Sequence, residues 1–164
     1  MSATFVQLNQ GWNAEPNAPC PDVIVQGRDV LLTFFVNAFQ FEHFAPDERG
    51  VLRFVNAERY RLGPTNDEGW YRGECRFSQL APAWGEFYLV SGDASVLDAP
   101  DDWRVLGPRS GAGRHFLFYF RDSTFECVAQ ECVIEASADN ALHRQFPGAR
   151  LTSRCNGPAK SAGS

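Results

Sequence analysis

A strict two-residue alternation between residues 115 and 129 is the feature that most constrains the fold of this chain. In HFLFYFRDSTFECVA, every second position from Phe116 to Phe120 and again from Phe125 to Ala129 is Phe, Cys or Ala. Strand side chains alternate between two faces, whereas a helix would need a period of 3.6 residues. The segment therefore predicts an antiparallel hairpin turning at residues 121–124. In this register Phe120 faces Phe125, Phe118 faces Cys127 and Phe116 faces Ala129, all on the core side.

A second hairpin is predicted in DVIVQGRDVLLTFFVN, residues 22–37. A turn at Gly27-Arg28 would place Val25 opposite Val30 and Val23 opposite Leu32. Its second strand is apolar on both faces, which is typical of a strand in the middle of a sheet. We therefore expect this strand to be central.

Similar apolar segments, separated by Gly, Pro, Asn and Asp, recur along most of the chain, as in antiparallel sandwiches and barrels. Aromatic residues, which favour pleated surfaces, make up 13% of the sequence. We expect one all-β domain over residues 1–137, an antiparallel sandwich or partly open barrel of about eight to ten strands. Residues 138–164 are expected to form an irregular segment and flexible tail, with a short helical turn near 139–146. The predicted strands are 3–8, 22–26, 29–37, 51–56, 58–62, 70–78, 84–91, 102–106, 114–121 and 124–135.

Charge and termini restrict the partners and the location. The formal net charge of −5 repels phosphate backbones and anionic lipid, so neither nucleic acid nor a membrane is an expected partner. The N-terminus lacks the pattern of a signal peptide, and no apolar run is long enough to span a bilayer. Five cysteines, an odd number, are spread along the chain and do not resemble a disulfide framework. We therefore expect a cytoplasmic protein with reduced thiols.

Motifs that carry known chemistry are absent from the sequence. It contains neither a G-x-S-x-G elbow nor a Gly-Lys-Ser/Thr phosphate loop. Cys75 and Cys127 are predicted to face the core, where a thiol stays protonated. Cys127 and Cys132 would lie on opposite faces of a continuous strand, too far apart to share a metal. No catalytic residue, metal ligand or cofactor is therefore predicted.

The stretch RLGPTNDEGWYRGECRF, residues 61–77, is the best candidate for recognition. Alternation over 70–78 would point Trp70, Arg72 and Glu74 outward, after a connection at 63–69 that is rich in turn formers. A turn between two strands explains the same residues, so both interpretations stay open. If the stretch is a binding surface, an aromatic side chain among acidic neighbours suits a basic protein partner. The candidate residues are Asp67, Glu68, Trp70, Arg72 and Glu74.

Four segments together resemble a group of small uncharacterised bacterial all-β proteins. They are GWNAEPNAP, YRLGPTNDEGWYRG, LAPAWGEFY and FYFRDSTFECVA. The resemblance covers most of residues 5–135 and implies no activity and no site residues. Small acidic bacterial proteins also include immunity proteins that neutralise toxins, which is an analogy of type only.

The leading hypothesis is a non-enzymatic protein-binding module, immunity-like or regulatory, that uses this aromatic and acidic surface. The alternative is a small-molecule-binding or hydrolytic protein with a cleft around Glu42, His43 and Glu86, beside Trp84. A third possibility is a structural part of a larger assembly.

Overall fold

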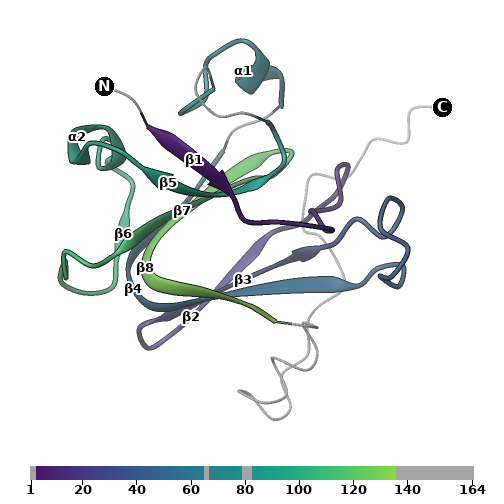
Figure 1. The fold of residues 1–164 in the computed structure, drawn as a ribbon, viewed down its shortest axis with the longest axis horizontal. Helices are drawn as coiled ribbons and strands as arrows, with labels where there is room; N and C mark the ends of the chain where they lie inside the picture. The colour runs from purple at the N-terminus through teal and green to yellow at the C-terminus, as the bar shows by residue number, and fades with distance from the viewer. Residues whose placement is uncertain (1–2, 65–66, 79–82, 136–164) are drawn as a thin grey trace.

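The computed structural model describes residues 3–64, 67–78 and 83–135. Within these ranges the chain forms one eight-stranded sheet and two short helices (Figure 1). In chain order the elements are β1 (Thr4–Gln7), β2 (Asp22–Gln26), β3 (Asp29–Phe35), β4 (Arg49–Pro64), α1 (Asp67–Tyr71), β5 (Phe87–Ser91), α2 (Ala94–Leu97), β6 (Arg104–Val105), β7 (Arg114–Tyr119) and β8 (Ser123–Glu135).

The strand order is β1-β5-β7-β8-β4-β3-β2, with β6 paired to β4, and every pair is antiparallel. The sheet is open, because β1 and β2 at its ends do not pair with each other. The predicted all-β antiparallel class is confirmed. The 22–37 hairpin is also confirmed, with Val25 opposite Val30, Val23 opposite Leu32 and β3 between two other strands.

The sheet folds over itself because its two longest strands bend. β4 bends at Asn56, whose φ of +52° lies in the left-handed region that asparagine tolerates. The Asn56 N–H donates to Asp29 Oδ1 (2.9 Å), and the pairing with β8 shifts between Ala57 and Arg59. The first half of β4 pairs with β3, and its second half pairs with β6, while β8 runs beside both halves. Figure 1 shows β4 and β8 curving together from one layer of the sandwich into the other.

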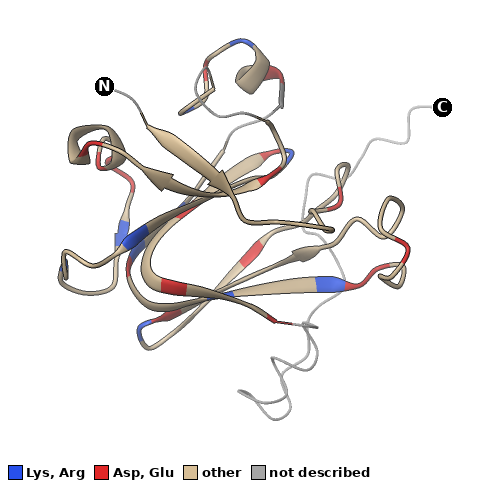
Figure 2. Ribbon diagram, viewed as in Figure 1, with Lys and Arg blue, Asp and Glu red and all other residues tan. Residues whose placement is uncertain are grey.

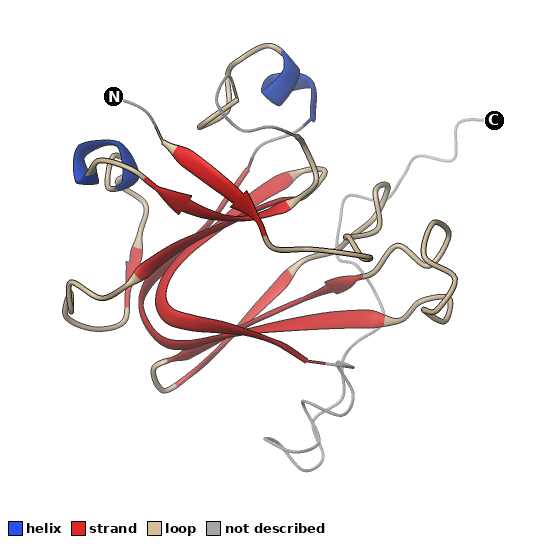
Figure 3. Ribbon diagram, viewed as in Figure 1, coloured by secondary structure: helices blue, strands red, loops and turns tan. Residues whose placement is uncertain are grey.

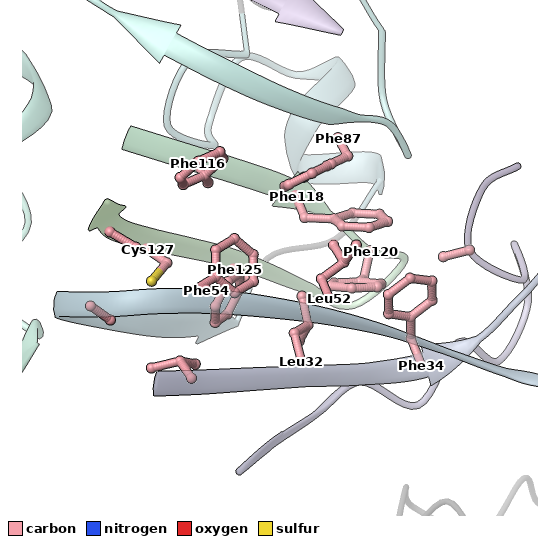
Figure 4. Packing of buried hydrophobic residues seen from close by; sticks show 14 of the residues in the cluster. Leu32, Phe34, Leu52, Phe54, Phe87, Phe116, Phe118, Phe120, Phe125 and Cys127 are labelled. Atoms are coloured by element: carbon pink, nitrogen blue, oxygen red, sulfur yellow. The ribbon is translucent and has the colours of Figure 1, made fainter. Parts of the chain in front are cut away.

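The main core lies between these two layers. Its buried side chains come from β3, β4, β5, β7 and β8, and phenylalanine dominates (Figure 4). Phe118 is fully buried and stacks on Phe120 at 4.3 Å and on Phe87 at 5.3 Å between ring centroids. The expected core face of the 115–129 hairpin is therefore correct.

The register expected for that hairpin is wrong by two residues. Phe118 pairs with Phe125 and Phe116 with Cys127. The Phe120 N–H donates to Ser123 O (2.8 Å), so the turn contains only Arg121 and Asp122. An even shift keeps every side chain on its expected face, which is why the core was still predicted correctly.

A second apolar cluster covers the outer face of β1, β5 and β7. Leu117, Tyr88 and Tyr119 are fully buried there, beneath α1, residues 72–78 and α2. The strand predicted at 70–78 does not exist, because this segment is the end of α1 and the turns that follow it. Figure 3 shows both helices beside the same layer of the sheet.

Other predicted strands differ mainly in length. The segments 51–56 and 58–62 are parts of the single strand β4, and 102–106 shrinks to the two residues of β6. The irregular segment at 138–164 and its helical turn lie outside the described residues.

Candidate functional site

The predicted recognition residues lie in the α1 segment, residues 67–78. Asp67 is the first residue of α1. Glu68 and Arg72 are solvent-exposed and form an i,i+4 ion pair of 4.0 Å. Glu74 is also exposed, in the turn after the helix. Glu68, Arg72 and Glu74 are therefore all exposed on this short segment.

Trp70 was expected to point outward, and it does not. It is half-buried, with its ring 5.9 Å from Trp84 and 6.4 Å from Tyr119 between centroids. The neighbouring Tyr71 is 74% exposed instead. Strand alternation would bury Tyr71 and expose Trp70, which is the reverse of what is found. Successive side chains are about 100° apart around a helix axis, rather than 180° apart as in a strand, so the strand pattern does not apply to this segment.

Local hydrogen bonds hold the α1 segment in shape. The Arg72 N–H donates to Glu68 O (3.0 Å), and the Glu74 N–H donates to Gly69 O (2.8 Å). Gly73 has a φ of +78°, a conformation that closes the helix and costs a glycine little. The surface carrying Tyr71 is therefore ordered before any partner arrives.

A buried carboxylate, which sequence reasoning missed, anchors this segment to the sheet. Glu126 on β8 has an exposed fraction of 0% and accepts hydrogen bonds from three cationic or imidazole groups. Arg61 Nη1 lies 2.6 Å from its Oε2, Arg76 Nε lies 3.0 Å from its Oε1, and His115 Nε2 lies 2.7 Å from Oε1. We call these four residues the Glu126 cluster.

Burial alone would raise the pKa of Glu126, because desolvation disfavours the charged form. Hydrogen bonds and positive charge from His115, Arg76 and Arg61 outweigh burial, and the pKa is lowered. Glu126 is therefore ionised. An ionised carboxylate only accepts hydrogen bonds, so His115 Nε2 carries the proton between them.

The Glu126 cluster connects three separate parts of the chain. Arg76 Nη1 and Nη2 donate to Val96 O and Leu97 O of α2, each at 2.6 Å. Arg61 Nε and Nη2 hold Asp102, at 2.6 and 3.1 Å. These contacts give every nitrogen of both guanidinium groups a hydrogen-bond partner and link the α1 segment and α2 to the sheet.

The hydroxyl of Tyr88 belongs to the same outer face. It donates to Ala83 O (2.9 Å) and accepts from the Ala83 N–H (3.1 Å). Burial, with a smaller effect of Glu86, raises the pKa of Tyr88 to about 12. The folded protein therefore keeps Tyr88 neutral at pH values where a tyrosine in water loses its proton, near pH 10.

This pKa predicts a loss of stability at alkaline pH. Between about pH 10 and pH 12 the unfolded chain releases the Tyr88 proton and the folded protein does not, so stability falls as pH rises. Between pH 9 and pH 11 we expect the unfolding free energy of the wild type to drop by about 1 kcal/mol more than that of Tyr88→Phe. Urea unfolding at both pH values measures the difference. Equal losses in the two proteins would contradict the shifted pKa.

The alternative cleft would combine residues from two segments, Glu42 and His43 in the loop between β3 and β4 and Glu86 just before β5. His43 is exposed in the loop between β3 and β4 and packs on Phe44, with 4.0 Å between ring centroids. Glu86 precedes β5, where its carboxylate accepts hydrogen bonds from Gln7 and Asn9. Within the described ranges no hydrogen bond or ion pair joins His43 to either carboxylate.

The cysteines differ from expectation in two respects. Cys75, Cys127 and Cys132 are reduced, but Cys20 is disulfide-bonded, so the prediction of reduced thiols is wrong for Cys20. Cys127 and Cys132 both pack against the main core, because the alternation of β8 shifts between them. Burial raises the pKa of the Cys132 thiol to about 12 and that of Cys127 well above its usual value. These two thiols are therefore protonated and poorly nucleophilic.

No group of three or more His, Cys, Asp and Glu residues with metal-binding geometry occurs in the part of the chain that the structure describes. In that same part, neither helix has the length and apolar character needed to cross a membrane. Comparisons with protein-family models, with curated proteins and with solved structures found no match.

Proposed function

We propose that this chain is a non-enzymatic protein-binding module whose contact surface is the exposed side of the α1 segment. The observation that carries the proposal is the exposure of Tyr71 on an ordered support. Tyr71 is 74% exposed, while its neighbour Trp70 is packed on Trp84 and Tyr119. A tyrosine held in place offers a large contact area at small entropic cost, as in binding hot spots.

The charges around Tyr71 favour a basic partner. Residues 67–74 contain Asp67, Glu68 and Glu74 against a single arginine, and the whole chain has a net charge of −5. An acidic field speeds the encounter with a positively charged protein and disfavours acidic competitors. The cluster around Glu126 supports the proposal further, because Arg76 fixes the end of the segment to the sheet. In the finer form of the proposal, the protein is an immunity-like or regulatory bacterial protein.

Photo-crosslinking in cells of the source organism tests the proposal. A photoreactive phenylalanine analogue replaces Tyr71 in one variant and Val105 in another. Val105 is a matched control, because it is 71% exposed and lies on β6 rather than on the α1 segment. We expect a discrete cross-linked protein of basic composition from position 71 and none from position 105.

Charge reversal and truncation complete the test. Glu68→Lys combined with Glu74→Lys should abolish the cross-link, and Tyr71→Ala should weaken binding of the identified partner about 30-fold, as expected at a hot spot. Each variant should retain the unfolding midpoint of the wild type, because these side chains are exposed. Equal cross-linking from positions 71 and 105, or none from position 71, would contradict the proposal.

A further inference from the structure

A small pocket opens at the end of the sandwich, at a site separate from the α1 segment. Its walls are Trp12 from the N-terminal loop, Phe34 and Val36 from β3 and its continuation, Phe44 from the β3–β4 loop and Leu52 from β4. Its volume is about 140 Å³. An apolar cavity of similar size holds a benzene-sized molecule. We call this site the end pocket; Figure 4 shows Phe34 and Leu52 on the neighbouring strands that form part of its wall.

Gly50 keeps the end pocket open. A Cβ atom at this position would lie 3.0 Å from Val36 Cγ1 and 3.2 Å from two ring atoms of Phe34, which are both wall residues. Glycine inside a strand costs about 0.5–1 kcal/mol relative to alanine, and such positions often mark a close approach by a ligand or another chain. The absent side chain at Gly50 is therefore part of the shape of the pocket.

Two of the three charged residues that border the pocket face away from it. Arg49 pairs with Phe35, and its guanidinium lies 4.5 Å over the Phe35 ring and donates to Thr33 Oγ1. Thr33 and Phe35 are on the opposite face of β3 from Phe34, which lines the pocket. Glu135 pairs with Val51, and Glu135 Oε1 lies 3.4 Å from Arg53 Nε. The charged groups of Arg49 and Glu135 therefore interact with other residues and not with the interior of the pocket.

Glu48 is the remaining charged residue and lies on the pocket face. Glu48 O accepts a hydrogen bond from the Val36 N–H (3.0 Å), which continues the β3–β4 pairing by one step and puts Glu48 on the same side as Val36. Glu48 Oε2 accepts from the Ala45 N–H (2.9 Å), and no described lysine, arginine or histidine forms an ion pair with it. Figure 2 shows acidic residues, in red, in the β3–β4 loop beside this end of the sheet.

We propose that the end pocket binds a small organic cation with an apolar body and an ammonium head. The apolar walls would enclose a body of about one six-membered ring, consistent with the volume. The rings of Trp12, Phe34 and Phe44 present aromatic surface, which attracts cations as well as apolar groups. The ammonium head would lie at Glu48, and the overall negative charge would favour its approach.

Three probes with the same ring test the charge preference in the full-length protein. They are phenethylammonium, the neutral 2-phenylethanol and the anionic 3-phenylpropanoate, each titrated while amide chemical shifts are recorded by NMR. We expect phenethylammonium to saturate with a dissociation constant of about 1 mM and to move the amides of Val36 and Gly50. The alcohol should bind about five-fold more weakly, and the anion should not saturate.

Two charge-matched variants separate a local from a general effect. Glu48→Gln should weaken phenethylammonium about five-fold and bring it level with the alcohol. Asp101→Asn removes the same charge at an exposed position outside the pocket and should leave affinity unchanged. Gly50→Ala should block both phenethylammonium and 2-phenylethanol; if this variant does not fold, Glu48→Gln and Asp101→Asn still decide the question.

Three outcomes would overturn the proposal. Equal affinity for the three probes would show an apolar pocket without charge preference. Shifts that map away from Val36 and Gly50 would place binding elsewhere. Absence of binding by all probes would mean that the pocket is closed in solution or is filled by another part of the chain.

Discussion

Replacing Glu126 with glutamine is expected to lower the free energy of unfolding by about 3–5 kcal/mol, because the largely buried guanidinium of Arg76 loses its carboxylate partner and that of Arg61 keeps only Asp102. Arg61 and Arg76 both bond this carboxylate, and their side chains are only 15% and 16% exposed. Urea unfolding measures the change. Glu131→Gln is the matched control: it lies on the same strand but is exposed, and its effect should stay within about 0.5 kcal/mol.

The pH dependence of the same variant provides a second readout. The pKa of Glu126 is lowered in the folded protein, so its stabilising effect is present above the unfolded pKa of about 4.3 and is lost as pH falls through the folded value. Below about pH 5 the wild type should therefore lose stability faster than Glu126→Gln. Asp98, whose pKa is also lowered, is paired with Arg59 and Arg109, which do not contact Glu126, so it contributes equally to both proteins. If the two acid profiles run parallel, the Glu126 cluster does not stabilise the fold as described.

Removing the ring of Phe118 is expected to cost about 3–5 kcal/mol, the usual range for a buried Phe→Ala substitution. Phe118 contacts Phe34, Phe87 and Phe120, so its loss would leave a cavity between the two layers that these rings cannot fill. The measurement is again the free energy of unfolding in urea. If Phe118→Ala does not fold, Phe118→Leu gives a smaller change of the same sign.

Phe39→Ala is the matched control for this substitution. Phe39 is 99% exposed in the β3–β4 loop, so removing the same ring should change stability by less than about 0.5 kcal/mol. Similar losses from the two substitutions would contradict the assignment of the core to the space between the layers.

Local alternation was enough to predict the class of fold and the faces of its main strands. It placed Phe116, Phe118 and Phe120 in the core, together with Phe125 and Cys127 on the partner strand. It could not distinguish a two-residue turn from a longer one, because both keep the same residues on the same face. The hairpin register was therefore wrong while the core was right.

Alternation failed at residues 70–78 for a different reason. A strand needs a neighbouring edge to pair with, and sequence periodicity does not report whether one exists. Arg76 would share the outward face of Trp70, Arg72 and Glu74 in a strand, but its side chain instead bonds Glu126, a residue fifty positions away in the chain. A local pattern does not report contacts between such distant segments, so the Glu126 cluster could not be predicted from it.

The bend shared by β4 and β8 has a consequence for how the molecule loses its structure. Each of these strands belongs to both layers, so neither layer can separate without breaking backbone hydrogen bonds that also order the other. Partial unfolding would expose the phenylalanines of both layers at once. The domain should therefore melt as one cooperative unit, with backbone and aromatic signals changing together.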